Sequence, residues 1–226
     1  MTLKLYKVQF IELLVQAQAL QFGSFVLKSG REAPYFLNTG KFYTGPLLYQ
    51  LGRFYAEAFL DSGVEVDVIF GPAYKGIPLS VVTTSVLYSE FEKKVSYCFN
   101  RKESKDYGDA KGSLLVGAPL NESSRVLLID DVITAGTAIR ESVELLKTQG
   151  NPQIQGILIA MNRMEKNNEG QNALEEVEKQ LGVKVFSIVN LDEVIEVLYN
   201  REVGGQMYID DDKMAVIKEY RAQYGC

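Results

Sequence analysis

The run of apolar residues at 126–129, which leads directly into Asp130 and Asp131, constrains the fold of this chain more than any other feature. Four apolar residues bounded by polar ones are typical of a strand buried on both faces of a parallel sheet. Parallel strands are joined by helical crossovers, and apolar residues at helical spacing follow at 139–146. The sequence therefore predicts an α/β fold with a mostly parallel central sheet flanked by helices.

The turn after the two acids is suited to bind an anion. Residues 132–138 include Gly136, which lets the backbone approach a ligand, and the amides at the start of the next helix point at an anion. Thr134 and Thr137 add hydroxyl donors. Ligands of open α/β sheets bind at the carboxyl ends of the strands, where this turn lies. Because the two carboxylates suit sugar hydroxyls or a metal-bound sugar, the motif predicts a ligand with a phosphate and a ribose diol.

Two other interpretations of this motif are less favourable. No Lys follows the turn in the Gly-Lys-Ser/Thr arrangement, so the segment is not a nucleoside-triphosphate P-loop. An ordinary strand–turn–helix with a capping Thr is the structural alternative. Two acids at the end of a buried strand argue against it, because charges there require a partner.

Composition excludes several classes of function. The chain has 226 residues, 46% hydrophobic and 23% charged, as in ordinary globular proteins, and its net charge of 24 − 29 = −5 disfavours nonspecific nucleic-acid binding. The absence of His excludes Ser–His and Cys–His nucleophile pairs and the usual zinc sites. Cys98 and Cys226 have no metal-site spacing, and no disulfide is expected. No apolar run approaches the roughly 20 residues of a membrane span, and no signal peptide is recognised, so we expect a cytoplasmic protein.

Helical and strand patterns alternate through the middle of the chain. Helices are expected within 3–20, 46–62, 77–88, 139–149, 174–181, 194–199 and 214–220, strands over 64–70, 95–100, 113–116, 126–129, 154–161 and 183–189, and short strands and turns over 22–38. Residues 162–170 are expected to form a polar surface loop. The pattern predicts a single domain with a small N-terminal hood at about 1–45, a core at about 60–200 and a C-terminal helical tail at 201–226. It suggests no function for the tail.

Two further loops carry cations. Residues 71–76 follow a predicted strand at the same edge of the sheet, and Lys75 in this loop can place a charge on a pyrophosphate. Alone, this segment would be read as a Gly-Pro loop with an exposed Lys. Residues 101–112 hold four cations and three acids between two strands. A solvated hairpin loop is one interpretation; the functional one is a lid that brings Arg101, Lys102 and Lys105 to a leaving pyrophosphate.

The segment 25–38 and a late arginine are candidates for binding a flat base. Phe36 can stack on a ring, and Lys28 can meet an anionic substituent, although plain packing and turns are the more usual explanation of such a segment taken alone. Arg163 follows the strand predicted at 154–161, and an arginine suits bidentate recognition of a carboxylate.

Four segments together resemble the orotate phosphoribosyltransferases, a family of the type I phosphoribosyltransferases. They are Leu-Lys-Ser-Gly-Arg…Pro-Tyr-Phe, Gly-Pro-Ala-Tyr-Lys-Gly-Ile-Pro, Asn-Arg-Lys-Glu-x-Lys-Asp and Asp-Asp-Val-Ile-Thr-Ala-Gly-Thr-Ala, in the family's order over about 22–191. The resemblance implies transfer of phosphoribosyl from 5-phosphoribosyl 1-pyrophosphate (PRPP) to orotate in pyrimidine biosynthesis. It also implies Mg²⁺ held mainly by PRPP rather than directly by the protein, and a homodimer whose mobile loop crosses into the neighbouring active site.

The resemblance also assigns roles to individual residues. It implies that PRPP contacts Lys28, Tyr74, Lys75, Arg101, Lys102, Lys105, Tyr107, Asp130, Asp131, Val132, Ile133, Thr134, Ala135, Gly136, Thr137 and Ala138. It implies that orotate contacts Lys28, Phe36, Leu37, Thr134 and Arg163. The catalytic groups would be Lys75, Lys105, Asp130 and Asp131, with Lys105 the most important loop cation, and Ala73–Tyr74 is expected to be a cis peptide bond.

Two departures from the family's pattern change these expectations. Tyr107 stands where the family usually has His, and a phenol with a pKa of about 10 is a poor proton carrier at neutral pH. Asn162 stands where the family often has Asp, which predicts a weaker electrostatic anchor for Arg163. Two alternatives stay open at this point: another nucleobase phosphoribosyltransferase, and a PRPP-binding regulator without turnover.

Overall fold

A six-stranded sheet forms the centre of the computed structural model, which describes residues 3–27, 30–103, 114–167 and 169–226. The strand order is β5-β4-β3-β6-β7-β8, and β5 alone among these strands runs antiparallel to its neighbour. The strands are β3 (Val68–Gly71), β4 (Ser96–Asn100), β5 (Leu115–Gly117), β6 (Arg125–Asp130), β7 (Gln153–Asn162) and β8 (Val185–Asn190). The prediction of a mostly parallel sheet in an α/β fold is confirmed.

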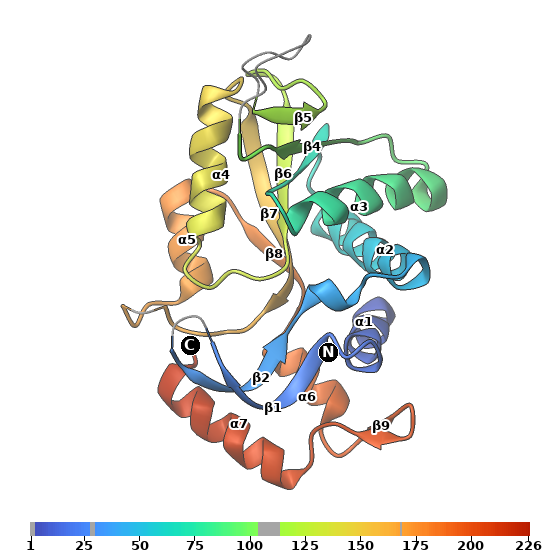
Figure 1. Ribbon diagram of the computed structural model, residues 1–226, viewed down its shortest axis with the longest axis vertical. Coiled ribbons are helices and arrows are strands. Elements are labelled where there is room, and N and C mark those ends of the chain that lie inside the picture. Colours follow the sequence, from blue (N-terminus) through green and yellow to red (C-terminus); the bar gives the residue numbers. More distant parts are fainter. Residues whose placement is uncertain (1–2, 28–29, 104–113, 168) are drawn as a thin grey trace.

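Helices cover both faces of this sheet (Figure 1). They are α1 (Leu5–Gln16), α2 (Gly45–Ser62), α3 (Gly76–Phe91), α4 (Thr137–Thr148), α5 (Ala173–Leu181), α6 (Leu191–Leu198) and α7 (Asp211–Tyr224). Alternate residues of each strand face opposite sides. Leu127 and Ile129 of β6 pack in the core that α2 and α3 share, whereas Val126 and Leu128 pack in the core on the side of α4 and α5. Such double burial explains why β6 is apolar at consecutive positions.

A hairpin near the start of the chain and the last helix lie together beyond the carboxyl ends of the central strands. Strands β1 (Leu20–Val26) and β2 (Glu32–Leu37) form an antiparallel hairpin, and the short helix η1 (Thr39–Lys41) follows. Helix α7 lies beside this hairpin (Figure 1), and the rings of Tyr35 and Tyr220 meet edge to face at 6.0 Å. The hairpin and α7 therefore form a cover over the edge of the sheet where ligands of α/β proteins bind.

Some element boundaries differ from the sequence expectation. Strand β3 begins at Val68 rather than at 64, because the neighbouring strands reach it only from Val68 onward, opposite Ser96 and Val126. Residues 201–226, expected to be helical, contain the two-stranded hairpin of β9 (Glu202–Val203) and β10 (Gln206–Met207) before α7. Among the helices of the described residues, none combines the length and the apolar character that crossing a membrane requires.

Candidate active site

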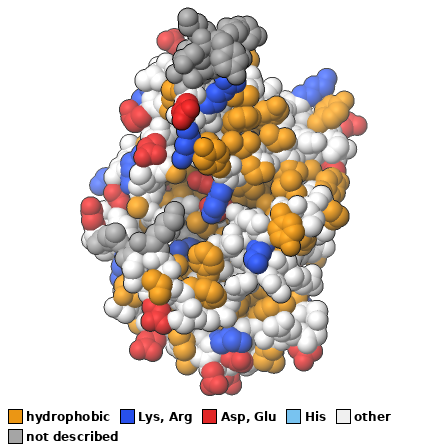
Figure 2. Space-filling model, viewed as in Figure 1, with side chains coloured by type: hydrophobic (Ala, Val, Ile, Leu, Met, Phe, Trp, Pro, Cys, Tyr) orange, Lys and Arg blue, Asp and Glu red, His pale blue; other side chains and the backbone are white. Residues whose placement is uncertain are grey.

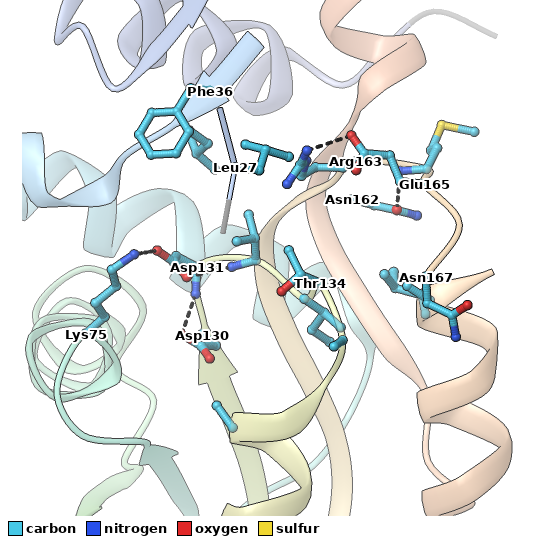
Figure 3. A pocket seen from close by; sticks show the side chains of 18 of the residues that line it. Leu27, Phe36, Lys75, Asp130, Asp131, Thr134, Asn162, Arg163, Glu165 and Asn167 are labelled. Atoms are coloured by element: carbon cyan, nitrogen blue, oxygen red, sulfur yellow. Dashed lines mark hydrogen bonds and ion pairs between the residues drawn. The ribbon is translucent and has the colours of Figure 1, made fainter. Parts of the chain in front are cut away.

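A cavity of about 740 Å³ lies between the carboxyl ends of the central strands and the β1–β2 hairpin (Figure 3). It brings together these residues predicted from the sequence: Phe36, Leu37, Tyr74, Lys75, Asp130, Asp131, Val132, Ile133, Thr134, Ala135, Ala138 and Arg163. Gly136 and Thr137 continue the same turn into α4. Arg101 and Lys102 do not line the cavity, but the ammonium of Lys102 lies 4.9 Å from the ring centroid of Tyr74. Lys28, Lys105 and Tyr107 lie outside the described residues.

The two acids at the end of β6 are held by groups from distant segments. The exposed fraction of Asp131 is only 5%; its Oδ2 accepts a hydrogen bond from Thr39 Oγ1 at 3.0 Å and lies 2.6 Å from Lys75 Nζ. The hydroxyl of the buried Tyr55 donates to the carbonyl oxygen of Asp130 at 2.8 Å, which fixes the strand end. Both carboxylates are thereby presented to the cavity rather than to bulk water.

The environment of Asp130 changes its acidity. Burial, followed by the negative charge of Asp131, raises the pKa of the Asp130 carboxyl to about 6. The backbone amide of Asp131 donates to Asp130 Oδ1 at 2.8 Å and partly offsets these effects. Near neutral pH the pair can still act as hydrogen-bond acceptors for sugar hydroxyls.

The turn after the acids leaves its amides available. The backbone N–H groups of residues 133–136 donate to no other group within the part of the chain that the structure describes. Gly136 has a left-handed φ of 69°, and a Cβ there would lie 2.6 Å from Val177, so this sharp entry into α4 requires glycine. Arg140 donates to the carbonyl oxygen of Ala135 and holds the turn from outside. Unpaired amides at the start of a twelve-residue helix are a suitable site for a phosphate.

The loop between β3 and α3 approaches the acids from the neighbouring strand. The Ala73–Tyr74 peptide bond is cis, as the resemblance implies. The amide of Ala73 donates to Asn100 Oδ1 at 2.8 Å, which ties the loop to the end of β4. From this loop Lys75 reaches across the cavity to Asp131 (Figure 3). A ligand bound beside the acids would therefore also meet a cation.

The opposite wall of the cavity presents an aromatic ring and a mostly buried arginine. Phe36 is half exposed toward the cavity and stacks on Phe25 with their centroids 5.7 Å apart. The guanidinium of Arg163 lies 2.7 Å from Glu165 Oε1, and the exposed fractions of the two side chains are 11% and 12%. This wall can receive a flat ring that carries a carboxylate.

The carboxylate partner of Arg163 is Glu165, while Asn162 Oδ1 accepts from the amide of Met164. The expectation that 162–170 is a polar surface loop is wrong, since Arg163, Glu165 and Asn167 line the cavity (Figure 3). Polar residues of this segment face the cavity rather than bulk solvent.

Sequence reasoning missed four residues that support the site: Thr39 and Tyr55 for the acids, and Tyr35 and Glu165 for the arginine. Thr39 and Asp131 are 92 positions apart, so no local motif joins them. Only for Glu165 does the sequence hold a signal, an acid two positions after Arg163.

The residues in the described ranges form no group of three or more acidic, His or Cys side chains that would hold a metal ion alone. The donor set of Asp130 and Asp131 consists of carboxylate oxygens, which fit a hard cation such as Mg²⁺ when a ligand supplies most of the coordination.

Comparisons with known proteins agree with this arrangement. The family model for the phosphoribosyl transferase domain matches residues 38–197. The chain is 47% identical over 224 residues to an orotate phosphoribosyltransferase of Clostridium beijerinckii, covering 99% of both chains. It is 50% identical over 223 residues to that of Photorhabdus laumondii, covering 99% of this chain and 100% of the relative.

A solved structure is similar along nearly the whole chain. The crystal structure of orotate phosphoribosyltransferase from Francisella tularensis has 36% sequence identity and a TM-score of 0.83, covering 96% of this chain and 100% of that one. The residues that the family model matches include β6, the turn after it and the loop that holds Lys75. By both sequence and fold, this chain belongs to the orotate phosphoribosyltransferase family.

Proposed function

We propose that this protein transfers the 5-phosphoribosyl group of PRPP to orotate, giving orotidine 5′-monophosphate and pyrophosphate in the biosynthesis of UMP. The observation that carries the proposal is one cavity that holds an acid pair, a turn with unpaired amides, a lysine and a mostly buried arginine. These groups match a diol, a phosphate, a pyrophosphate and a carboxylate. Neither uracil or a purine base as the acceptor, nor PRPP bound alone by a regulator, would use all four groups.

PRPP would occupy the side of the cavity formed by β3 and β6. Asp130 and Asp131 would accept hydrogen bonds from the ribose diol, and residues 132–138 would wrap the 5′-phosphate. Tyr74 and Lys75 would contact the pyrophosphate, with Lys102 close by. Lys28, Arg101, Lys105 and Tyr107 stay predicted PRPP contacts, and Lys105 stays the predicted principal cation of the loop.

Orotate would occupy the side formed by β2 and the loop after β7. Phe36 would stack on the pyrimidine ring, and Leu37 and Thr134 would border it. Glu165 engages one terminal nitrogen of Arg163, while the other points into the cavity toward the space below Phe36 (Figure 3). The orotate carboxylate would pair with this free side of the guanidinium.

The chemistry requires positioning and charge stabilisation more than proton transfer. N1 of deprotonated orotate forms a bond to C1′ of the ribose while the bond from C1′ to the pyrophosphate oxygen breaks, and both electrons leave with pyrophosphate. Lys75 would stabilise the charge that develops on this leaving group. Mg²⁺ chelated by PRPP, with Asp130 and Asp131 nearby, would add to that neutralisation. The absence of His fits a reaction that needs no strong base.

The assembly would be a homodimer in which the loop around 101–112 crosses into the neighbouring site. Exposed hydrophobic side chains on α3 and β4, among them Val81, Tyr88 and Tyr97, support an interface there. Figure 2 shows hydrophobic side chains gathered over these elements. Mixing the inactive variants Lys105→Ala and Asp131→Asn should restore activity if the loop is shared, because a mixed dimer then has one intact site. The cytoplasm stays the predicted place of the reaction.

An acceptor assay tests the proposal directly. Pyrophosphate release is measured with PRPP and Mg²⁺ plus orotate, uracil, adenine or hypoxanthine. Release with orotate alone among the four bases supports the proposal. Release with another base but not with orotate would identify a different nucleobase phosphoribosyltransferase. Binding of PRPP without release in any mixture would identify a non-catalytic regulator.

A further inference from the structure

Arg163, the arginine of the cavity, belongs to a network of contacts that continues away from the cavity. Glu165 Oε1 accepts hydrogen bonds from Arg163 at 2.7 Å and from the hydroxyl of Tyr35 at 2.5 Å. The guanidinium carbon of Arg163 also lies 5.5 Å from the ring centroid of Tyr35. One carboxylate oxygen therefore connects the arginine to β2, 128 positions earlier in the chain.

The C-terminal segment holds the loop that carries Glu165. Glu165 and Gly225 form an antiparallel bridge, flanked by hydrogen bonds from Lys166 N to Tyr224 O at 2.8 Å and from Cys226 N to Met164 O at 3.1 Å. Backbone pairing thus brackets Glu165 on both sides and fixes the direction of its side chain.

A second arginine closes the same network. Arg31, which follows β1, donates to the carbonyl oxygens of Lys166 and Asn167 at 2.8 and 3.0 Å. Its guanidinium lies 4.8 Å from the ring centroid of Tyr224, and this ring packs against that of Tyr220 at 5.0 Å. The hairpin, the loop after β7 and α7 therefore form one packed unit behind Arg163.

We propose that Glu165 is the residue that positions Arg163 for the carboxylate of the base, and that the segment 224–226 acts through Glu165 in the same way. The inference rests on the proposed function, since it concerns how orotate is recognised. It also gives a role to the end of α7, for which the sequence suggested none.

The physical reason is the flexibility of an arginine side chain. Arg163 has several rotatable bonds, and bidentate pairing with a carboxylate requires one orientation of its planar fork. A charge-assisted bond from Glu165 to one edge of the fork leaves the other edge directed at the cavity. Binding of the base then loses less conformational freedom than binding to a mobile arginine would.

Steady-state kinetics of three variants test the proposal, with KM for orotate, KM for PRPP and kcat measured separately. Glu165→Gln should raise KM for orotate about tenfold, and Tyr35→Phe should raise it about threefold. Gly225→Ala should also raise it about threefold, because a Cβ there would lie 2.6 Å from the carbonyl oxygen of Arg221 and disturb the bridge. The KM for PRPP and kcat should change by less than about twofold in each.

Two controls separate positioning from general stability. Tyr6→Phe removes a hydroxyl that donates to Asp61 at 3.0 Å, away from the cavity, so it should leave KM for orotate unchanged. Glu193→Gln removes a comparably buried ion pair to Lys7, 2.6 Å long and away from the cavity. It should lower Tm without changing KM for orotate.

The results overturn the proposal in defined ways. An unchanged KM for orotate in Glu165→Gln would exclude positioning, and a lower KM would show that Glu165 competes with the substrate carboxylate. Equal increases of KM for orotate and KM for PRPP would indicate that Glu165 has only a structural role. Failure of the proposed function itself would appear differently, as a wild-type protein that releases no pyrophosphate with orotate.

Discussion

The two sides of the cavity are built in different ways. The PRPP side consists of two short stretches, 71–76 and 130–138, each of which follows one strand of the central sheet. The base side combines β2, the loop after β7 and the end of α7, which span the chain from Tyr35 to Gly225. The residues that would contact the phosphoribosyl donor thus come from two local strand–turn–helix stretches, whereas those that would recognise the base come from segments far apart in the chain.

The largest expected effect lies on the PRPP side. Asp131→Asn should lower kcat/KM for PRPP by about 100- to 1,000-fold, because an amide cannot replace the carboxylate that Thr39 and Lys75 hold in place. Asp67→Asn is the control, since Asp67 pairs with Arg125 on the surface at the start of β6. A change of less than about threefold in Asp131→Asn would remove the acid pair from the mechanism.

Arg163→Lys tests whether the two sides are separable. A lysine cannot reproduce the fork that Glu165 holds, so kcat/KM for orotate should fall about 10- to 100-fold. The dissociation constant of PRPP, measured by calorimetry, should stay the same. Arg140→Lys removes the bond to Ala135 and loosens the turn at 132–138, so it should weaken the binding of PRPP instead. Loss of PRPP binding in Arg163→Lys would contradict the division into two sides.

The pH dependence of kcat/KM for PRPP should follow the titration of the Asp130 carboxyl. Its pKa is raised to about 6, so acid below that pH protonates the carboxylate and removes an acceptor for the ribose diol. We expect kcat/KM for PRPP to fall about tenfold per unit below pH 6. The inflection should move to lower pH in Asp131→Asn, because the charge of Asp131 is the second cause of the shift. A fixed inflection would assign it to another group.

The same group should affect stability with the opposite sign. A raised carboxyl pKa means that the folded protein binds this proton more firmly than the unfolded chain does. Between pH 6 and about 4, the ordinary value for Asp, this group's contribution to the free energy of unfolding therefore grows as the pH falls. Denaturant titrations of wild type and Asp130→Asn isolate this contribution.

The smallest expected effect concerns the support of the acid pair. Thr39→Val keeps the shape of the buried side chain but removes its hydrogen bond to Asp131. KM for PRPP should rise about threefold, and the free energy of unfolding should fall by about 1 kcal/mol in denaturant titrations. Thr84→Val, whose hydroxyl donates within α3, is the matched control for the stability change. A change in KM for orotate alone would contradict the assignment of Thr39 to the PRPP side of the cavity.

The PRPP side could be predicted from the sequence because its signals are local. An apolar strand, two acids and a Gly-containing turn occur within thirteen consecutive positions from Val126 to Ala138, and their order determines their geometry. The cis bond at Ala73–Tyr74 followed from the resemblance and is present.

The supports of the site could not be predicted in the same way. Thr39 reaches Asp131, and Tyr35 reaches Glu165, only after the hairpin folds over the sheet edge. Glu165 appeared to belong to a polar surface loop because hydrophilic residues between two elements usually face solvent. Its burial depends on the C-terminal segment, and no pattern in the segment 162–170 reveals that partner.

The ion pair between Lys75 and Asp131 has a consequence for competing anions. A phosphate that takes Lys75 as its partner leaves a buried carboxylate without its cation, which is costly in a partly desolvated cavity. Inorganic phosphate and pyrophosphate carry no sugar diol that could bond to Asp131 in exchange. A sugar that carries both a diol and a diphosphate compensates the acid and the lysine together. The ion pair between Lys75 and Asp131 therefore favours binding of PRPP over binding of inorganic phosphate or pyrophosphate.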